Sequence, residues 1–451
     1  MTAVPPATLR SPRDRLVRAL GRLRNRTLRR LEYLAYDVIG MPMAVAALRR
    51  GFRPAGDGDA AFLHAWYGRV YWRLPAGIFR LLAAIVLWPF VQLVLTTAMT
   101  RRNGAAMRQR AGRPAGRQVR DQLVLAAECS IAPLWYYMFE LYDDAQRARA
   151  PLFLTAHETI AGAYEALQPP PGSDDLNDKV WFAGHCRAHG IAAVPVLLLL
   201  AGGRILPVLD EATDLPEADL FVKPRVGNGG RNTERWDWRD GRYHSSRDLT
   251  LAPEALRAHL ALQSLKGDFV VQPRVVNHPE LVDLANDALS TVRVLTCRDE
   301  AGGFEATNAA FRMAIGSNNR VDNFHSGGIA TAVDLATGRL GPATDMGVRP
   351  AVGWRESHPV SGAPFVGRRL PFWPQVLDLA CRTHAIFPER TVVGWDVAML
   401  PDGPIIIEGN GRPDLDIHQR VERRPLGDQR IAALLRLNLS RRAPAARHQR
   451  R

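Results

Sequence analysis

The chain has 451 residues, of which 47% are apolar and 23% charged. This length exceeds one ordinary domain, so we expect two or three domains and a large core. The formal net charge of +14 comes mostly from arginine, and much of the excess lies outside the segments that carry chemical motifs. The distribution favours a basic arm over a basic active site, and we expect no nucleic-acid partner.

The four cysteines are scattered, without a CxxC pair or a His/Cys cluster at metal-ligand spacing. This pattern is typical of a reducing, cytoplasmic compartment. The N-terminus has arginines but no early apolar stretch followed by a cleavage site, so a secretory signal is not expected.

Residues 10–30 predict a basic amphipathic helix, because leucines recur at helical spacing among arginines. Such a helix can lie on anionic lipid, tether nucleic acid or remain a solvated arm.

Residues 81–99 form an uncharged apolar segment that as a helix would reach about 28 Å. Pro89 and Gln92 interrupt its middle, and arginines flank both ends. A single span would place the first arginine-rich segment outside, against the positive-inside tendency. A re-entrant or interfacial helix kinked at Pro89 and a buried helix of a soluble domain both remain open. In the first case the chain would sit peripherally on the inner face of the membrane.

The domain organisation follows from shifts in composition. We expect a basic, mainly helical region over residues 1–168, with a polar linker at 103–118, and a boundary at PPPGSDD, because consecutive prolines stop helices. Residues 169–435 alternate short apolar strand-like runs with helical stretches, which indicates an α+β domain. Residues 436–451 are expected to be a basic disordered tail.

The segment GWDVAMLPDGPIIIEGN ends in two polar residues that are two positions apart, Glu408 and Asn410. Residues two apart in a strand share a face, and a hairpin closed near Pro401–Gly403 would bring Asp396 alongside them. Carboxylate and amide oxygens are ligands that Mg2+ shares with waters and nucleotide phosphates. We therefore predict a metal site at Asp396, Glu408 and Asn410, the alternative being ordinary polar residues at a loop end.

A second segment, LFVKPRVGNGG, places Lys223 at the end of an apolar strand before a glycine-rich loop. Glycines allow the backbone N–H groups to approach a polyphosphate, and the lysine supplies a positive charge. The spacing fits neither the P-loop nor the dinucleotide-binding pattern, and a plain β-turn is the alternative. The predicted loop residues are Gly227, Gly229 and Gly230.

Three further candidates lie near these segments. Lys179 stands at a predicted helix start and is a second candidate phosphate contact or a surface lysine. The apolar run FVVQPRV, with Val271 and Gln272, can present backbone groups to an adenine edge. Arg293 stands on a buried-looking strand, where an unpaired charge is costly, so it should face an anion.

In chain order, the motifs are DK…HGI..P, FVKPxxGxGG, VVQP, TVRV, VDNFHSGGIATAVDLATGRLG and GWDVAMLPDGPIIIEGNGRP. Together they resemble the sugar-transfer-associated group of the ATP-grasp superfamily over residues 175–425. The resemblance implies an ATP-grasp fold, in which two α+β subdomains clasp ATP. It also implies Mg2+, or Mn2+ in its place, at the three metal positions. It places Lys179 and Lys223 on the phosphates, Arg293 on an acylphosphate, and Arg312 and Asn323 beside the substrate.

The resemblance further implies a carboxylate–amine ligase, or a ligase using a similar nucleophile, that acts through an acylphosphate. Its substrate would be a sugar-linked or amino-acid carboxylate in polysaccharide biosynthesis. Two alternatives stay open: a kinase that phosphorylates a hydroxyl, and a non-catalytic nucleotide sensor that partners a glycosyltransferase complex. The complete set of lysine and metal-ligand positions argues against the sensor. Asp414 departs from the glycine common among relatives, which puts the shape of the acceptor pocket in doubt.

Overall fold

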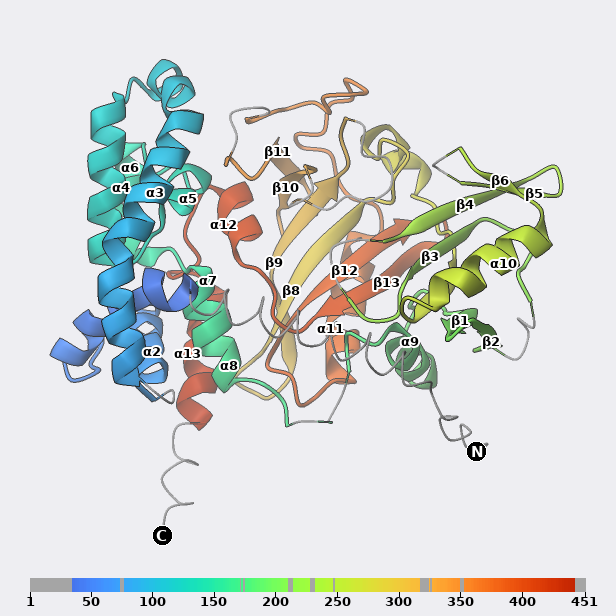
Figure 1. The fold of residues 1–451 in the computed structure, drawn as a ribbon, viewed down its shortest axis with the longest axis horizontal. Helices are drawn as coiled ribbons and strands as arrows, with labels where there is room; N and C mark the ends of the chain where they lie inside the picture. The colour runs from blue at the N-terminus through green and yellow to red at the C-terminus, as the bar shows by residue number, and fades with distance from the viewer. Residues whose placement is uncertain are drawn as a thin grey trace, which may run out of the picture.

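The computed structural model describes residues 35–73, 77–170, 172, 175–209, 214–227, 232–245, 248–316, 324, 327–348 and 353–442. The predicted basic helix at 10–30 lies outside these residues, as do Gly229, Gly230 and Asn323. Within the described part the chain is a mixed α+β protein with a helical region ahead of two antiparallel sheets (Figure 1), which confirms the predicted fold class.

The helical region begins with a helix at residues 35–49. Short 3-10 and π turns at 150–152 and 159–163 join its later helices. The region continues with α2 (Asp59–Arg73), α3 (Gly77–Ala111), α4 (Ala115–Cys129), α5 (Pro133–Met138), α6 (Asp144–Ala148), α7 (Ala156–Glu158) and α8 (Tyr164–Ala166).

Helix α3 contains the whole apolar segment 81–99, with Pro89 inside it. The polar linker expected at 103–118 is wrong except at residues 112–114, because α3 continues to Ala111 and α4 begins at Ala115. Asn103 explains the continuation: it is buried, and its side-chain amide donates to the carbonyls of Met99 and Val348. A polar sequence thus packs inward because its amides find partners in the fold.

The first sheet has the strand order β2-β1-β7-β3-β4-β5-β6. Helix α10 (Pro253–Ser264) packs against it and buries Leu256 and Leu260. Its strands are β1 (Leu198–Ala201), β2 (Arg204–Pro207), β3 (Leu220–Pro224), β4 (Glu234–Arg239), β5 (Arg242–Ser245), β6 (Thr250–Leu251) and β7 (Phe269–Pro273).

The second sheet has the strand order β11-β10-β9-β8-β12-β13. It is joined to the first where residues 192–194 pair with Ile406 before the chain enters β1. A 3-10 helix, η3 (Pro279–Leu284), lies between β7 and β8. The strands are β8 (Thr291–Arg298), β9 (Phe304–Met313), β10 (Ile329–Val333), β11 (Leu340–Thr344), β12 (Val392–Leu400) and β13 (Gly403–Asn410).

The two faces of this second sheet differ in chemistry. On one face, apolar residues such as Val294, Phe311 and Trp395 form a core with α9 (Lys179–Ala188) and α11 (Trp373–Ala385). Alternate residues project to the other face, which carries the charged side chains of the candidate site. Helices α12 (Asp416–Glu422) and α13 (Arg430–Arg442) cover the rest of that second face.

The helical region shares a core with the sheet part of the chain. Leu63, Leu154 and Tyr164 pack in one cluster with Leu295 of β8 and Leu435 of α13. The expected boundary after residue 168 therefore divides two parts that are packed together. The expectation of a disordered tail is wrong for residues 436–442, because α13 runs to Arg442 and buries Leu439 against β8. The rest of the expected tail lies outside the described residues.

Candidate active site

The hairpin of β12 and β13 forms as predicted, with Leu400 opposite Gly403 at its turn. Asp396 lies directly opposite Glu408, and Gly394 lies opposite Asn410. A β-bulge after Asp396 places Ile407 outside the regular pairing, so Glu408 and Asn410 are aligned with the face of Asp396. The three predicted metal ligands thus come together on one side of the sheet.

Asp396 is held by two arginines on the neighbouring strands. Arg293 lies opposite Asp396 on β8 and donates to both carboxylate oxygens, at 3.0 Å to Oδ2. Arg312 of β9 contacts the same Oδ2 at 2.9 Å and also donates to the Thr291 hydroxyl. Asp396 is only 3% exposed, and burial alone would raise its pKa. The charges and hydrogen bonds of the two arginines outweigh burial and lower that pKa to about 2.

Two buried lysines lie near this cluster, Lys223 on the first sheet and Lys179 at the start of α9. Lys223 at the end of β3 is 8% exposed, and burial lowers its pKa to about 8, which Glu408 partly offsets. Burial also lowers the pKa of Lys179, again against the influence of Glu408. Glu408 therefore lies close enough to act on both lysines, where the two sheets meet near β3 and β13 (Figure 1).

Lys179 is positioned by the start of α9. The Asp178 carboxylate caps this helix by accepting from the N–H groups of Val180 and Trp181, and it also pairs with Arg225 just after β3. The ammonium of Lys179 donates to the carbonyl of Gly227 at 2.9 Å. This bond ties the lysine to the first glycine of the predicted phosphate loop. The sequence analysis did not name Asp178 and Arg225, although an aspartate just before a helix is a recognised capping signal.

The positive and negative charges of the side chains around Asp396 and the two lysines do not balance. Four buried or half-buried cations gather with two carboxylates. Asp178 also acts on Lys179 but is itself paired with Arg225, so cations remain in excess even when Asp414 at the far end is included. An excess of buried positive charge is costly unless an anion joins it. The cations are Lys179, Lys223, Arg293 and Arg312, and the carboxylates are Asp396 and Glu408.

Val271 and Gln272 lie on β7 in the middle of the first sheet. The Val271 carbonyl accepts from the N–H of Leu197, and the Gln272 amide donates to the carbonyl of Val194 at 3.2 Å. Gln272 is 4% exposed. Both residues are thus engaged within the protein, and their contact with adenine stays a prediction.

The donor set suits a hard cation. Among the described residues no three His, Cys, Asp or Glu side chains form a metal cluster, but the predicted set has two carboxylates and one amide. These oxygens, beside two lysines that can meet phosphates, are the sparse set that Mg2+ accepts when a nucleotide supplies further ligands. Each carboxylate oxygen has two lone pairs, so the arginine bonds of Asp396 leave acceptor capacity. Asp396, Glu408 and Asn410 therefore fit a bound Mg2+ ion.

The far end of the cluster meets the helical region. Asp416 is buried and accepts from the indole N–H of Trp135 at 2.8 Å, and burial beside Asp414 raises its pKa well above the usual value. His418 is fully buried, and burial together with Arg293 lowers its pKa to about 3, so it is neutral near pH 7. Trp135 could not be predicted from local patterns, because its contact with Asp416 joins residues 281 positions apart.

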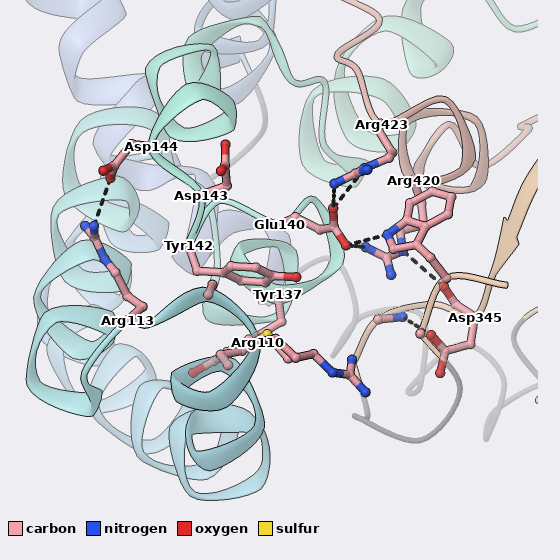
Figure 2. Close-up of a pocket in the computed structure, with 15 residues that line it drawn as sticks. Arg110, Arg113, Tyr137, Glu140, Tyr142, Asp143, Asp144, Asp345, Arg420 and Arg423 are labelled. Carbon is pink, nitrogen blue, oxygen red and sulfur yellow. Dashed lines mark hydrogen bonds and ion pairs between the residues drawn. The ribbon is translucent and has the colours of Figure 1, made fainter.

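A separate cavity of about 650 Å³ lies where the helical region meets the second sheet (Figure 2). Its wall includes Glu140, which pairs with Arg420 at 3.0 Å and Arg423 at 2.9 Å and accepts from the indole of Trp354. Arg420 also donates to the carbonyl of Met138. None of the predicted site residues lines this cavity, and Glu140 is paired with both Arg420 and Arg423, so we interpret these three residues as a clamp between the two parts of the chain.

Comparisons with solved structures find distant likenesses. A D-alanine-D-alanine ligase from Coxiella burnetii has 12% identity and a TM-score of 0.33, over 61% of this chain and 60% of that one. A D-alanyl-alanine synthetase A from Vibrio cholerae has 11% identity and a TM-score of 0.34, over 59% and 65%. An L-amino acid ligase from Bacillus licheniformis has 11% identity and a TM-score of 0.32, over 58% and 48%. The matched region thus spans less than two thirds of each, and likeness at this level bears on neither activity nor substrate.

The sequence matches none of the curated proteins with which it was compared. The profile of the family described as "Sugar-transfer associated ATP-grasp" matches residues 164–431. This range contains both sheets and every residue of the candidate site, and it confirms the resemblance stated from the motifs. Because the match covers more than half of the sequence, the chain belongs to the sugar-transfer associated ATP-grasp family.

Proposed function

We propose that this protein is an ATP- and Mg2+-dependent ligase that joins a carboxylate to an amine or a similar nucleophile through an acylphosphate. One observation carries the proposal: buried cations outnumber carboxylates between the two sheets of an ATP-grasp chain. A polyphosphate is the anion that would balance this excess. The substrate would be a sugar-linked or amino-acid carboxylate in polysaccharide biosynthesis, and the description of the family supports the link to sugar transfer.

In the proposed first step, a carboxylate oxygen of the acid attacks the γ-phosphorus of ATP. The bond from that phosphorus to the bridging oxygen breaks, and ADP leaves with the electron pair. Lys179 and Lys223 would hold the phosphates, and Arg293 and Arg312 would stabilise charge on the transferred group. Asp396, Glu408 and Asn410 would hold Mg2+, which when bound neutralises phosphate charge.

In the second step, the nucleophile attacks the carbonyl carbon of the acylphosphate. The carbon–oxygen bond to phosphate breaks, inorganic phosphate leaves, and the nitrogen gives up a proton. Burial of the arginines and of Asp396 keeps water from the mixed anhydride, which would otherwise hydrolyse.

Hydroxylamine trapping tests the proposal. The full chain is incubated with ATP, Mg2+ and a panel of uronic acids and amino acids, and ADP, hydroxamates and product masses are measured. A ligase gives a hydroxamate together with ADP, because hydroxylamine captures the acylphosphate. A stable phosphate ester would mean a kinase, and nucleotide binding without turnover across the panel would mean a sensor. Glu408→Gln should abolish the hydroxamate, whereas the matched exposed change Glu389→Gln should not.

A further inference from the structure

The first half of α3 turns its apolar side chains outward. Its inward side mixes apolar and polar residues: Ala84 is fully buried there, and the polar side chains of Gln92 and Thr96 are only 1% and 2% exposed. A helix of a water-soluble protein normally has the opposite arrangement, with apolar residues inside. The outward residues are between 55% and 73% exposed, and they are Phe79, Leu82, Val86, Phe90, Leu93 and Val94.

This outward face is larger than a soluble monomer normally leaves in water. Residues 79–94 extend over about 22 Å of helix at 1.5 Å per residue. Contiguous apolar patches of this size mark protein or membrane interaction sites. Only 17% of the apolar window of α3 is buried, so the helix is not the core helix of a soluble bundle.

The charges beside the patch select the occupant. Arg101, Arg102 and Arg108 continue along α3 and are exposed, and Arg117 and Arg120 follow on α4. The 35 residues of α3 contain no aspartate or glutamate. Packed against the same helix of a second copy, α3 would therefore meet no counter-charge. An anionic lipid surface offers both an apolar layer and phosphates for the arginines.

The fold also sets the orientation of the helix. Beyond residue 99, α3 is tied to its neighbours: the Gln118 amide donates to the carbonyl of Gly104, and the Gln122 amide donates to the hydroxyl of Thr100. With this end fixed and the side of α3 that contains Ala84, Gln92 and Thr96 buried, α3 meets lipid along one side only. This geometry disfavours a span in which lipid surrounds the helix.

We propose that α3 docks side-on onto an anionic membrane surface, with its outward apolar residues among the acyl chains and its arginines at the lipid phosphates. The proposal does not depend on the proposed enzymatic function. Helix α3 lies at one edge of the molecule and β5 and β6 lie at the opposite edge (Figure 1), so the docking helix is remote from the junction of the two sheets.

Vesicle co-sedimentation of the full chain tests this proposal. We expect the protein to pellet with vesicles rich in phosphatidylglycerol and much less with pure phosphatidylcholine, and to be released in part by high salt. Phe90→Gln with Leu93→Gln should weaken binding to both vesicles by about a hundredfold, because both side chains leave the apolar layer. Arg101→Gln with Arg102→Gln should weaken binding to the anionic vesicles by at least about tenfold.

The matched control is Leu262→Gln, an equally exposed apolar residue on α10, which should bind as the unchanged protein does. Circular dichroism checks that each variant is folded. The proposal is overturned if the unchanged protein stays in the supernatant with both vesicles, or if the α3 variants bind normally. It is also overturned if sedimentation shows a dimer that Phe90→Gln dissociates while no vesicle is bound, because the face would then join two copies.

Discussion

Two buried carboxylates in this chain are each held by two arginines, and their surroundings differ. Glu140, between the helical region and α12, shares its arginines with Trp354 and with backbone carbonyls, so every charge in that cluster has a partner within the protein. Asp396, on β12, lies beside two lysines and Glu408, where cations are in excess. The same local pairing therefore serves as a clamp in one place and as a candidate anion site in the other. The residues around each carboxylate and its arginines decide between these two roles.

The largest expected difference between the clusters concerns turnover. Asp396→Asn removes a metal ligand and a negative charge while keeping the shape of the side chain, and we expect ATP turnover to fall about a thousandfold, or about 4 kcal/mol. Binding of an ATP analogue without Mg2+ should persist, since the cations remain. Glu140→Gln should leave turnover within about twofold of the unchanged protein. An equal loss of turnover in both variants would remove the distinction between the clusters.

Glu140 should matter for the stability of the protein, although it should not matter for turnover. Glu140→Gln leaves two buried arginine charges without their anion, and we expect the free energy of unfolding to fall by about 3 kcal/mol. Urea denaturation measures this change. The control is Glu300→Gln, which alters an exposed ion pair with Arg430 and should leave the denaturation midpoint unchanged. If the two variants unfold at the same urea concentration, the clamp contributes nothing.

Nucleotide affinity should also distinguish the two clusters, because Lys179 and Lys223 lie beside Asp396 and not beside Glu140. Lys223→Met removes one charge-assisted contact to phosphate, and we expect binding of an ATP analogue to weaken about thirtyfold, or about 2 kcal/mol. Lys266→Met serves as the control, because Lys266 is exposed at the end of α10. Isothermal titration calorimetry measures both. Unchanged affinity in Lys223→Met would place the phosphates elsewhere.

The smallest expected effect is a pH dependence of that binding. Burial lowers the pKa of Lys223 to about 8 in the free protein, and a bound polyphosphate would raise it. The lysine is therefore charged below about pH 8, and affinity should fall as pH rises through that value, by up to about tenfold per pH unit. Lys223→Met should lack this inflection, whereas Lys179→Met should keep it. A flat profile between about pH 7 and about pH 9 would contradict the assignment.

Local patterns in the sequence predicted much of the site. The alternation in β13 and the Pro–Asp–Gly turn were enough to align Asp396 with Glu408, because strand geometry has a fixed period of two. A glycine loop after an apolar strand located Lys223 in the same way. Hairpins and strand ends are short-range features, and the sequence encodes them directly.

Contacts between distant segments were not predictable in this way. Arg312 meets Asp396 across two strand pairings, Gln272 donates to Val194, and Trp135 meets Asp416 from another region of the chain. The burial pattern of α3 was also missed in part, since the sequence marks which residues are apolar but not which side of a helix the fold covers. Tertiary packing decides these features.

The metal dependence of nucleotide binding tests the central claim most directly. A non-hydrolysable ATP analogue is titrated into the full chain with and without Mg2+, and into Glu408→Gln under the same conditions. We expect Mg2+ to tighten binding of the analogue to the unchanged protein at least about tenfold. Glu408→Gln should lose this gain while it still binds the metal-free analogue. If Mg2+ tightened binding equally in both proteins, or in neither, Glu408 and the side chains aligned with it would not form the metal site.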